Sequence, residues 1–232
     1  MISQAGRKRL SRRFALRHVL GALLVVLALC RLTMADVARM QDSMQRHGGA
    51  SSVFQDWRRL IDEGRSLRAQ DKLGRINQFF NRKIQFTDDL QAWGQTDYWA
   101  TPIETLAKAK GDCEDFTIAK YFTLLEAGLP NEQLRLIYVK ARIGGPASNV
   151  TQAHMVLAYY PAPDEEPLIL DNLITEIRPA SRRPDLLPVF SFNSQGIWAS
   201  SNASGMPSDS GVGRLTRWQE LLKRVRAEGM EF

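Results

Sequence analysis

The stretch KAKGDCEDFTIAKYF, residues 108–122, combines a helix start with the features of a reactive site. Cys113 begins an apolar run and is flanked by three acids, Asp112, Glu114 and Asp115. Asp112 is a favourable N-cap, and acids in the first turn interact well with the helix dipole. The stretch therefore predicts a helix that starts at Cys113, is apolar on nearly all sides and ends near the Gly-Leu-Pro that follows.

The residues before this stretch predict further helices. Residues 101–104, Thr-Pro-Ile-Glu, have the cap, proline and glutamate of a capping box, which predicts a short helix ending near Gly111. Within residues 52–86 the apolar positions recur at helical spacing, which predicts two helices with a break at residues 63–64. The aromatic, irregular residues 88–102 predict a loop that helps to shape a cleft.

The residues after the 108–122 stretch have the composition of strands in place of helices. Runs rich in β-branched and aromatic residues, separated by Gly, Pro, Asn and Ser, predict strands at 134–141, 153–160, 168–171, 174–178 and 188–192. Short connections between successive strands favour antiparallel pairing. The order of helices followed by strands predicts an α+β fold, with an N-terminal helical part packed on an antiparallel sheet.

The first 35 residues have the three parts of a secretory signal peptide. Basic residues are followed by VLGALLVVLALC, residues 19–30, and by a small-x-small site at 33–35. The apolar run is shorter than the about 20 residues of a membrane span. We expect residues 1–35 to direct export; a retained inner-membrane anchor is the alternative. Residues 11–14 also resemble a twin-arginine signal, and residues 27–30 a lipoprotein box with a bulky residue in place of a small one.

Charge is distributed unevenly along the 232 residues, whose formal net charge is +6. Seven of the 31 Lys and Arg lie in the first 35 positions, which contain no acid, so 24 basic residues remain against 25 acidic ones. A nearly neutral exported chain argues against nucleic acid as a partner. Removing the leader also removes Cys30 and leaves Cys113 as a single thiol, so no internal disulfide is expected.

The exported chain keeps two histidines, and one of them suits a cysteine nucleophile. His47 lies in a polar stretch, whereas His154 begins one predicted strand and Asp171 ends the next. Antiparallel pairing of these strands brings His154 and Asp171 together at one edge of the sheet. A thiol nucleophile needs a base, and the base needs an orienting acceptor, so Cys113, His154 and Asp171 are candidate catalytic residues. Taken singly, each is more often structural.

Four stretches together resemble one protein family. They are YWATPIETL at 98–106, GDCEDF at 111–116, AHMVLAYY at 153–160 and LILDN at 168–172. They resemble the bacterial transglutaminase-like cysteine proteinases, in particular the LapG-type periplasmic proteases that release biofilm adhesins. The resemblance covers roughly residues 50–195.

The resemblance implies a papain/transglutaminase-like fold with Cys113 as nucleophile, His154 as general base and Asp171 as its orienting acid. It also implies Ca²⁺, held by the acids on either side of the cysteine, which are Asp112 and Glu114. Unaided, these acids raise the pKa of the thiol, and a bound cation offsets that effect. The alternative is that Asp112 is only an N-cap and Glu114 only a favourable first-turn acid.

The substrate and partners also come from the resemblance. It implies a periplasmic endopeptidase that cleaves the N-terminal region of a large surface adhesin beside an Ala-Ala pair. It implies an inner-membrane cyclic di-GMP receptor as the inhibitor. Two other functions share the same residues: transglutaminase- or amidase-type acyl transfer, and a binding module whose thiol is inert.

These observations divide the chain into five parts. The signal peptide at 1–35 is followed by a loose leader at 36–52 and a cysteine protease domain at 53–199. A Ser/Gly-rich stretch at 200–213 predicts a flexible linker. Residues 214–228 carry apolar side chains on one face, which predicts a C-terminal amphipathic helix.

Overall fold

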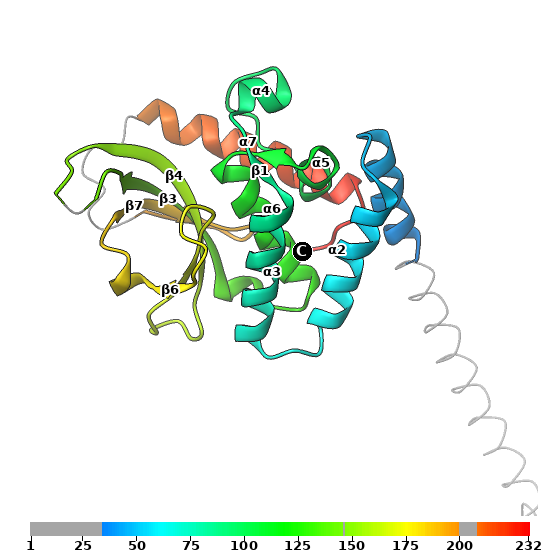
Figure 1. The fold of residues 1–232 in the computed structure, drawn as a ribbon, viewed down its shortest axis with the longest axis horizontal. Coiled ribbons are helices and arrows are strands. Elements are labelled where there is room, and N and C mark those ends of the chain that lie inside the picture. The colour runs from blue at the N-terminus through cyan, green and yellow to red at the C-terminus, as the bar shows by residue number, and fades with distance from the viewer. Residues whose placement is uncertain (1–33, 146, 200–207) are drawn as a thin grey trace, which may run out of the picture.

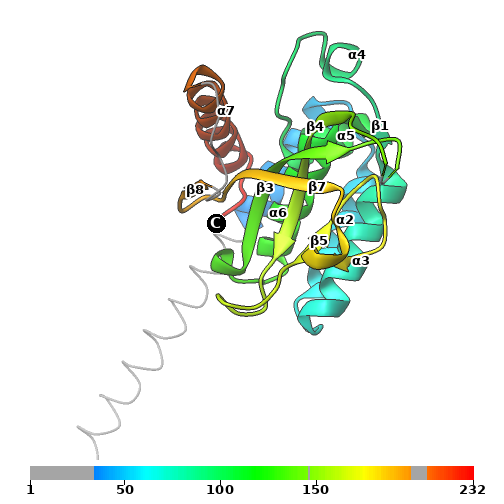
Figure 2. The ribbon, with the colours of Figure 1, turned by 90° about the vertical axis from the view of Figure 1, so that its left-hand side faces the viewer.

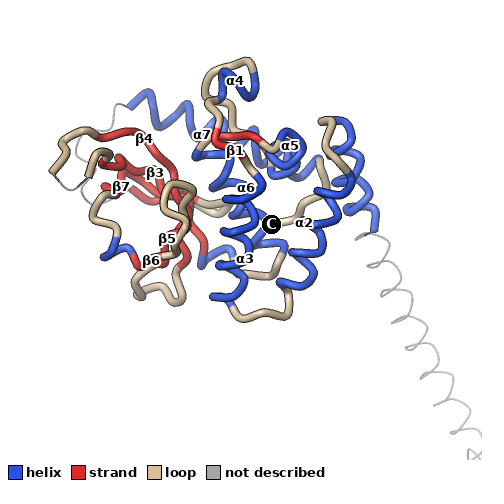
Figure 3. The backbone as a smooth tube through the Cα atoms, viewed as in Figure 1, coloured by secondary structure: helices blue, strands red, loops and turns tan. Residues whose placement is uncertain are grey.

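Helices precede strands in the computed structural model, which describes residues 34–145, 147–199 and 208–232 (Figure 1). Most helices gather on one side of the molecule and most strands on the other, as the predicted α+β fold requires, while the C-terminal helix extends over the strand side (Figure 3). The predicted signal peptide lies outside the described residues except for its last two positions. Within the described ranges, no helix combines the length and the apolar character needed to cross a membrane.

The helical part consists of a helix at residues 34–46 and five further helices. These are α2 (Ser51–Gly64), α3 (Ala69–Lys83), α4 (Asp89–Trp93), α5 (Pro102–Lys108) and α6 (Cys113–Glu126). Between them, β1 (Gln85–Phe86) and β2 (Lys110–Gly111) pair in parallel. The capping box predicted for α5 is present, with Thr101 and Glu104 bonded reciprocally.

Helix α6 is the centre of the fold. Every residue from Asp115 to Leu124 is buried, as the apolar character on all sides of this helix predicts. It packs against α3 and α5 on one side and against β3 and β4 on the other. The buried hydroxyl of Thr123 accepts a hydrogen bond from the indole of Trp57 in α2 at 2.9 Å. Helix α6 is thereby held between the helical part and the sheet.

The main sheet has the order β6-β5-β4-β3-β7-β8, and every neighbouring pair is antiparallel. Its strands are β3 (Leu134–Arg142), β4 (Thr151–Tyr159), β5 (Leu168–Leu170), β6 (Arg178–Pro179), β7 (Leu186–Phe192) and β8 (Ile197–Ala199). Two short 3₁₀ helices, Asn131–Gln133 and Ala180–Arg182, lie in the connections. Helix α6 lies against one face of the sheet (Figure 2).

The C-terminal helix α7 (Ser208–Ala227) closes the core on the side of β7 and β8. Trp218, which is 2% exposed, packs edge-on against Trp99 and Phe192 and stacks on Phe122. These aromatic contacts join α7, α6, the sheet and the loop before α5. Large buried aromatic side chains of this kind contribute much of the apolar burial that stabilises a domain.

Two predicted boundaries are wrong. The loose leader at 36–52 is mostly helix, because Met40 and Met44 are buried in the core on one face of residues 34–46. The flexible linker at 200–213 falls partly outside the described residues, but 208–213 already belongs to α7. In residues 34–46 and 208–213 the polar and small residues that suggest a loose chain belong to helices, which buried side chains such as Met44 and Trp218 attach to the core.

The strand predicted at 174–178 is also wrong, since only Arg178 and Pro179 pair with β5. The chain turns after β5, where the backbone N–H of Leu173 donates to the side chain of Asp171 at 3.0 Å. An aspartate that bonds its own backbone two residues on forms a turn in place of a strand.

Candidate active site

Cys113 is the first residue of α6. Oδ1 of Asp112 caps the helix by accepting hydrogen bonds from the backbone N–H groups of Glu114 at 3.1 Å and Asp115 at 3.4 Å. Gly111 permits the tight approach, because a Cβ at this position would lie 2.6 Å from the side chain of Asp115. The local sequence thus places the thiol at the N-terminal end of a buried helix, as predicted.

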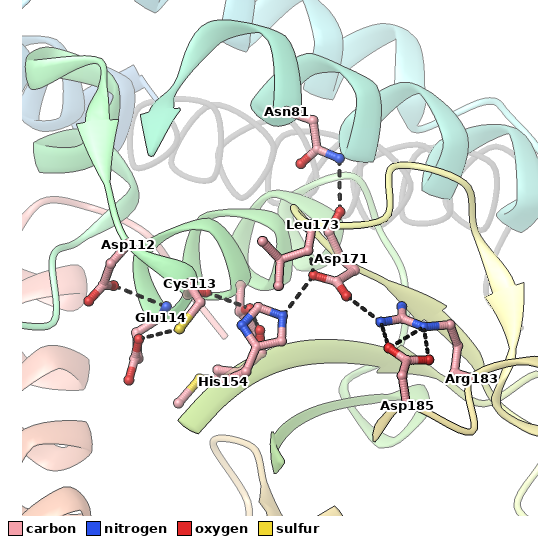
Figure 4. Close-up of polar contacts among 11 residues, drawn as sticks. Asn81, Asp112, Cys113, Glu114, His154, Asp171, Leu173, Arg183 and Asp185 are labelled. Atoms are coloured by element: carbon pink, nitrogen blue, oxygen red, sulfur yellow. Dashed lines mark hydrogen bonds and ion pairs between the residues drawn. The ribbon is translucent and has the colours of Figure 1, made fainter. Parts of the chain in front are cut away.

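The thiol of Cys113 lies among negative charges. Its Sγ donates to Oε2 of Glu114 at 2.7 Å (Figure 4). Burial, the charges of Glu114 and Asp112 and this hydrogen bond raise the pKa of Cys113 well above its usual range, whereas a backbone hydrogen bond from Met155 acts in the opposite direction. The sulfur therefore keeps its proton at neutral pH.

His154 and Asp171 meet as the strand pairing predicts. Antiparallel pairing sets Leu157 of β4 opposite Leu170 of β5, so the residue after β5 reaches back along β4. His154 Nε2 lies 2.8 Å from Oδ1 of Asp171, and both residues are buried. A carboxylate at Nε2 favours a proton on that nitrogen and leaves Nδ1 as the proton acceptor of the neutral ring.

The start of α6 is attached to β4 beside His154. The hydroxyl of Thr117 bridges the backbone carbonyls of Cys113, at 2.8 Å, and Met155, at 3.1 Å. The backbone of Met155 also hydrogen-bonds the sulfur. In Figure 4 the free nitrogen edge of the His154 ring is on the side of Cys113, and the other nitrogen faces Asp171. The predicted residues Cys113, His154 and Asp171 therefore gather at one place, in that order.

Hydrogen bonds fix both carboxylate oxygens and the backbone carbonyl of Asp171. Arg183 donates from Nη2 to Oδ2 at 2.7 Å, and Asp185 in turn accepts from Nη2 and Nε of Arg183 at 2.8 and 3.0 Å. Asn81 of α3 donates to the backbone carbonyl of Asp171 at 2.8 Å. Burial by itself would raise the pKa of Asp171, but His154, Leu173 and Arg183 outweigh it and hold this pKa at about 2. Asp171 is an anion throughout the neutral range.

A cluster of carboxylates lies next to the thiol. Oxygens of Asp89, Asp112 and Asp115 come within 4.8 Å of one another, as do ligand atoms of Asp112, Cys113 and Glu114. Burial and repulsion by neighbouring acids raise the pKa of Asp112 to about 10 and that of Asp89 to about 6. Among the described residues, none of the four carboxylates has a Lys, Arg or His ion-pair partner.

Asp115 has a structural role in this cluster. Its carboxylate is fully buried and accepts hydrogen bonds from the backbone N–H of Ala100 at 2.8 Å and the indole of Trp93 at 3.2 Å. These bonds attach the loop between α4 and α5 to the first turn of α6. Its side chain is therefore occupied by protein donors, whereas those of Asp112 and Glu114 are less enclosed.

The comparisons with known proteins agree with this arrangement. The family described as bacterial transglutaminase-like cysteine proteinase matches residues 61–200, which include the thiol, the imidazole and the carboxylate. The chain belongs to this family. None of the curated proteins compared with it matches. As a member of the bacterial transglutaminase-like cysteine proteinases, the chain is a cysteine protease with a transglutaminase-like fold.

Solved structures of LapG from Legionella pneumophila are similar to this cysteine proteinase. One is 39% identical, with a TM-score of 0.66, and the match covers 81% of this chain and 96% of that one. An EGTA-treated LapG structure is 40% identical with the same score and coverage. A calcium-bound LapG structure is 40% identical, also with a TM-score of 0.66, and the match covers 82% of this chain and 98% of that one.

Several residues around the site were missed by sequence reasoning. Arg183 and Asn81 hold Asp171, Thr117 attaches the nucleophile's helix to β4, and Asp89 joins the acid cluster. For Asp89 the sequence contains one signal, the pair of adjacent acids at the start of DDLQAWG, residues 88–94. The prediction of a loop over this stretch gives these acids no role. Arg183, Asn81 and Thr117 have no such signal, because a polar residue far in sequence from its partner cannot be distinguished from an ordinary surface residue.

The donor set next to the cysteine fits a hard divalent cation. Oδ2 of Asp89 accepts the backbone N–H of Tyr98 at 2.6 Å, but its Oδ1 is buried without a hydrogen-bond partner. Such an orphaned oxygen costs free energy unless a cation or water meets it. Asp112 and Glu114 add oxygens on the same side. Oxygen donors with several negative charges are the ligands that Ca²⁺ prefers.

Proposed function

We propose that this cysteine proteinase is an exported, calcium-dependent endopeptidase in which Cys113, His154 and Asp171 form the catalytic triad. The observation that carries the proposal is the 2.8 Å contact between His154 Nε2 and Asp171 Oδ1 beside the start of α6. It leaves the second ring nitrogen on the side of the sulfur (Figure 4). A nucleophile, a base and an orienting acid in this order are the elements of a cysteine protease.

In the acylation step, His154 Nδ1 takes the proton of the thiol and the sulfur of Cys113 attacks the peptide carbonyl carbon. The backbone N–H of Cys113, at the first position of a helix, supports the developing oxyanion. The imidazolium then gives its proton to the leaving nitrogen as the C–N bond breaks. The released product carries a new amino terminus, and the other part of the substrate is a thioester on Cys113.

In the deacylation step, His154 removes a proton from water, which attacks the thioester carbon. The C–S bond breaks, the thiol recovers its proton from the imidazolium, and the second product leaves with a new carboxyl terminus. Asp171 stays ionised during both steps and stabilises the imidazolium. Arg183 and Asn81 keep this carboxylate in place through their hydrogen bonds.

Asp112 and Glu114 would hold the calcium ion, and the orphaned Oδ1 of Asp89 makes this residue a third candidate ligand. Bound there, the cation neutralises the acids that otherwise raise the pKa of the thiol. Cys113 and His154 can then form the thiolate–imidazolium pair at neutral pH. The calcium-bound and EGTA-treated LapG structures support this assignment by similarity.

We further propose that the substrate is the N-terminal region of a large surface adhesin, cleaved beside an Ala-Ala pair in the periplasm. An inner-membrane receptor for cyclic di-GMP would act as the inhibitor, so that cleavage controls the release of biofilm cells. Similarity to LapG over most of the chain supports these proposals. The expected signal peptide at residues 1–35 supports export.

Incubation with the N-terminal region of an adhesin encoded in the same genome tests the proposal. Cleavage is expected with Ca²⁺ and is expected to disappear with EGTA or with Cys113→Ala. Mass spectrometry of the products separates hydrolysis from acyl transfer, because a transglutaminase joins the acyl group to an amine and leaves an isopeptide bond. Cleavage that persists at full rate in EGTA would overturn the role of calcium.

A further inference from the structure

A second group of metal-ligating side chains lies away from the thiol. His47 follows the helix at residues 34–46, Glu104 is in the first turn of α5, and Glu228 follows α7. Nε2 of His47, one oxygen of Glu104 and one oxygen of Glu228 all lie within 4.8 Å of one another. Three segments that are far apart in sequence therefore direct a nitrogen and two carboxylates to a common point.

The separations suit a shared cation better than direct hydrogen bonds. His47 Nε2 lies 3.9 Å from Oε1 of Glu104 and 3.8 Å from Oε1 of Glu228. Hydrogen bonds between these atoms would be about 2.7–3.2 Å long. Ligands bound to one ion, with bonds of about 2.0–2.2 Å, stand further apart than a hydrogen bond allows.

The two carboxylates differ in how well the protein satisfies them. Glu228 is 7% exposed, and its Oε2 is buried without a hydrogen bond of ordinary length and angle, although the side chain of Thr101 also interacts with this carboxylate. Its Oε1 accepts from the hydroxyl of Ser43 at 2.9 Å. Glu104 is bonded by the hydroxyl of Tyr98 at 2.7 Å and by the guanidinium of Arg224 at 2.5 Å. Hydrogen bonds that orient the carboxylates in this way are typical of the groups behind metal ligands.

The two carboxylates of this group carry more negative charge than the neighbouring basic side chains balance, which favours a bound cation. Arg224 is the only Lys or Arg among the described residues that forms an ion pair with Glu104 or Glu228. Two buried carboxylates therefore share one permanent positive charge. The imidazole of His47 is 36% exposed, so the group opens to solvent on one side.

We propose that His47, Glu104 and Glu228 form a second metal site, distinct from the calcium site, that takes a first-row divalent cation such as Zn²⁺. An imidazole with two carboxylates suits Zn²⁺ and related ions, whereas Ca²⁺ prefers oxygen ligands alone. Water from the open side would complete a four-coordinate shell. The ion would join the helix at 34–46 and the end of α7 to α5, the helix that precedes the nucleophile.

The test uses the full-length chain carrying Cys113→Ala, in which the active-site thiol cannot bind soft metals, with Ca²⁺ saturating the acid cluster. Co²⁺ is the probe, because its visible absorption reports imidazole and carboxylate ligands. Co²⁺ is expected to bind with one ion per chain and to be displaced by Zn²⁺. Zn²⁺ is expected to raise the Tm, since a ligand that binds only the folded state stabilises it.

Matched variants in the same background locate the ion. His47→Ala should abolish both the Co²⁺ spectrum and the Zn²⁺ effect on Tm, whereas His154→Ala should leave both unchanged. Ser43→Ala removes a hydrogen bond behind Glu228 and should weaken Zn²⁺ binding by about 10- to 100-fold. Absence of Co²⁺ binding, or binding unaffected by His47→Ala, would overturn the proposal. Both readouts measure metal binding and stability in an inactive background, so neither result depends on the proposed protease activity.

Discussion

Arg183 donates a hydrogen bond of 2.7 Å to Oδ2 of Asp171, while Oδ1 of the same carboxylate lies 2.8 Å from the imidazole of His154. The side chains of Arg183 and Asp171 are 2% and 0% exposed. The acid that orients the base is therefore one member of a buried ion pair. A buried pair of this kind is sensitive to the loss of either partner.

Arg183→Met should destabilise the protein and slow cleavage. Leaving the Asp171 carboxylate buried without its guanidinium is expected to lower the free energy of unfolding by about 3–5 kcal/mol. Urea unfolding measures this loss, and peptide cleavage measures the effect on rate. Arg182→Met is the matched control, because Arg182 is exposed and should stay within about 0.5 kcal/mol of the parent. Equal losses for both variants would contradict the role of Arg183.

The stability of the protein should fall between about pH 4 and pH 2 because of Asp171. Its pKa is about 2 in the folded state against 3.8 for an ordinary aspartate, so the folded state binds this proton more weakly than the unfolded state. The stabilisation is complete above the unfolded pKa and is lost as the pH falls through the folded pKa. Denaturant unfolding of the parent and Asp171→Asn as a function of pH isolates the contribution, since the other acids titrate alike in both. A difference between them that is independent of pH over this range would be inconsistent with the assignment.

Asp89→Asn should have opposite effects with and without Ca²⁺. Removing one negative charge from the cluster relieves repulsion, so the Tm in EGTA should stay the same or rise. The same change removes a charged ligand and should weaken Ca²⁺ binding by at least about tenfold, since ligand charge sets affinity. Calorimetric titration with Ca²⁺ and thermal unfolding measure the two effects. Asp88→Asn, at the exposed neighbouring position, should change neither.

The reactivity of Cys113 should depend on the cation. Without it, burial and the charges of Glu114 and Asp112 raise the pKa of the thiol, so alkylation by iodoacetamide at neutral pH should be slower than that of free cysteine. Addition of Ca²⁺ should increase the rate. A Cys30→Ser background makes the measurement report Cys113 alone. An inert thiol in both conditions would favour a binding module over an enzyme.

Much of the central fold follows from local sequence. The start of α6 at Cys113 is encoded by the Asp112 cap, and the start of α5 by the Thr101 capping box, because these hydrogen bonds lie within one turn. The proximity of His154 and Asp171 also follows from sequence. Antiparallel pairing of two adjacent strands brings the beginning of one to the end of the other.

Two segments differ from the structure that their local sequence predicts, because a few specific contacts decide their conformation. The helix at residues 34–46 depends on burial of Met40 and Met44, and composition alone does not show which polar segments find a core. The turn after β5 depends on the side chain of Asp171, which stops the strand predicted at 174–178. In each case a few specific contacts outweigh the average propensity of the segment.

By itself, the sequence determined the order of the central helices and of strands β3, β4, β5 and β7, and the three residues that meet beside the helix start, because caps, periodicity and neighbouring strands act over short distances. Only the tertiary structure decided what surrounds them. Arg183 beside Asp171, Asp89 beside Asp112, and the contact between Ser43 and Glu228, 185 positions apart, join segments that no local pattern connects. Such contacts form only when the packed core brings distant charged and polar groups together, where burial makes each unpaired group costly.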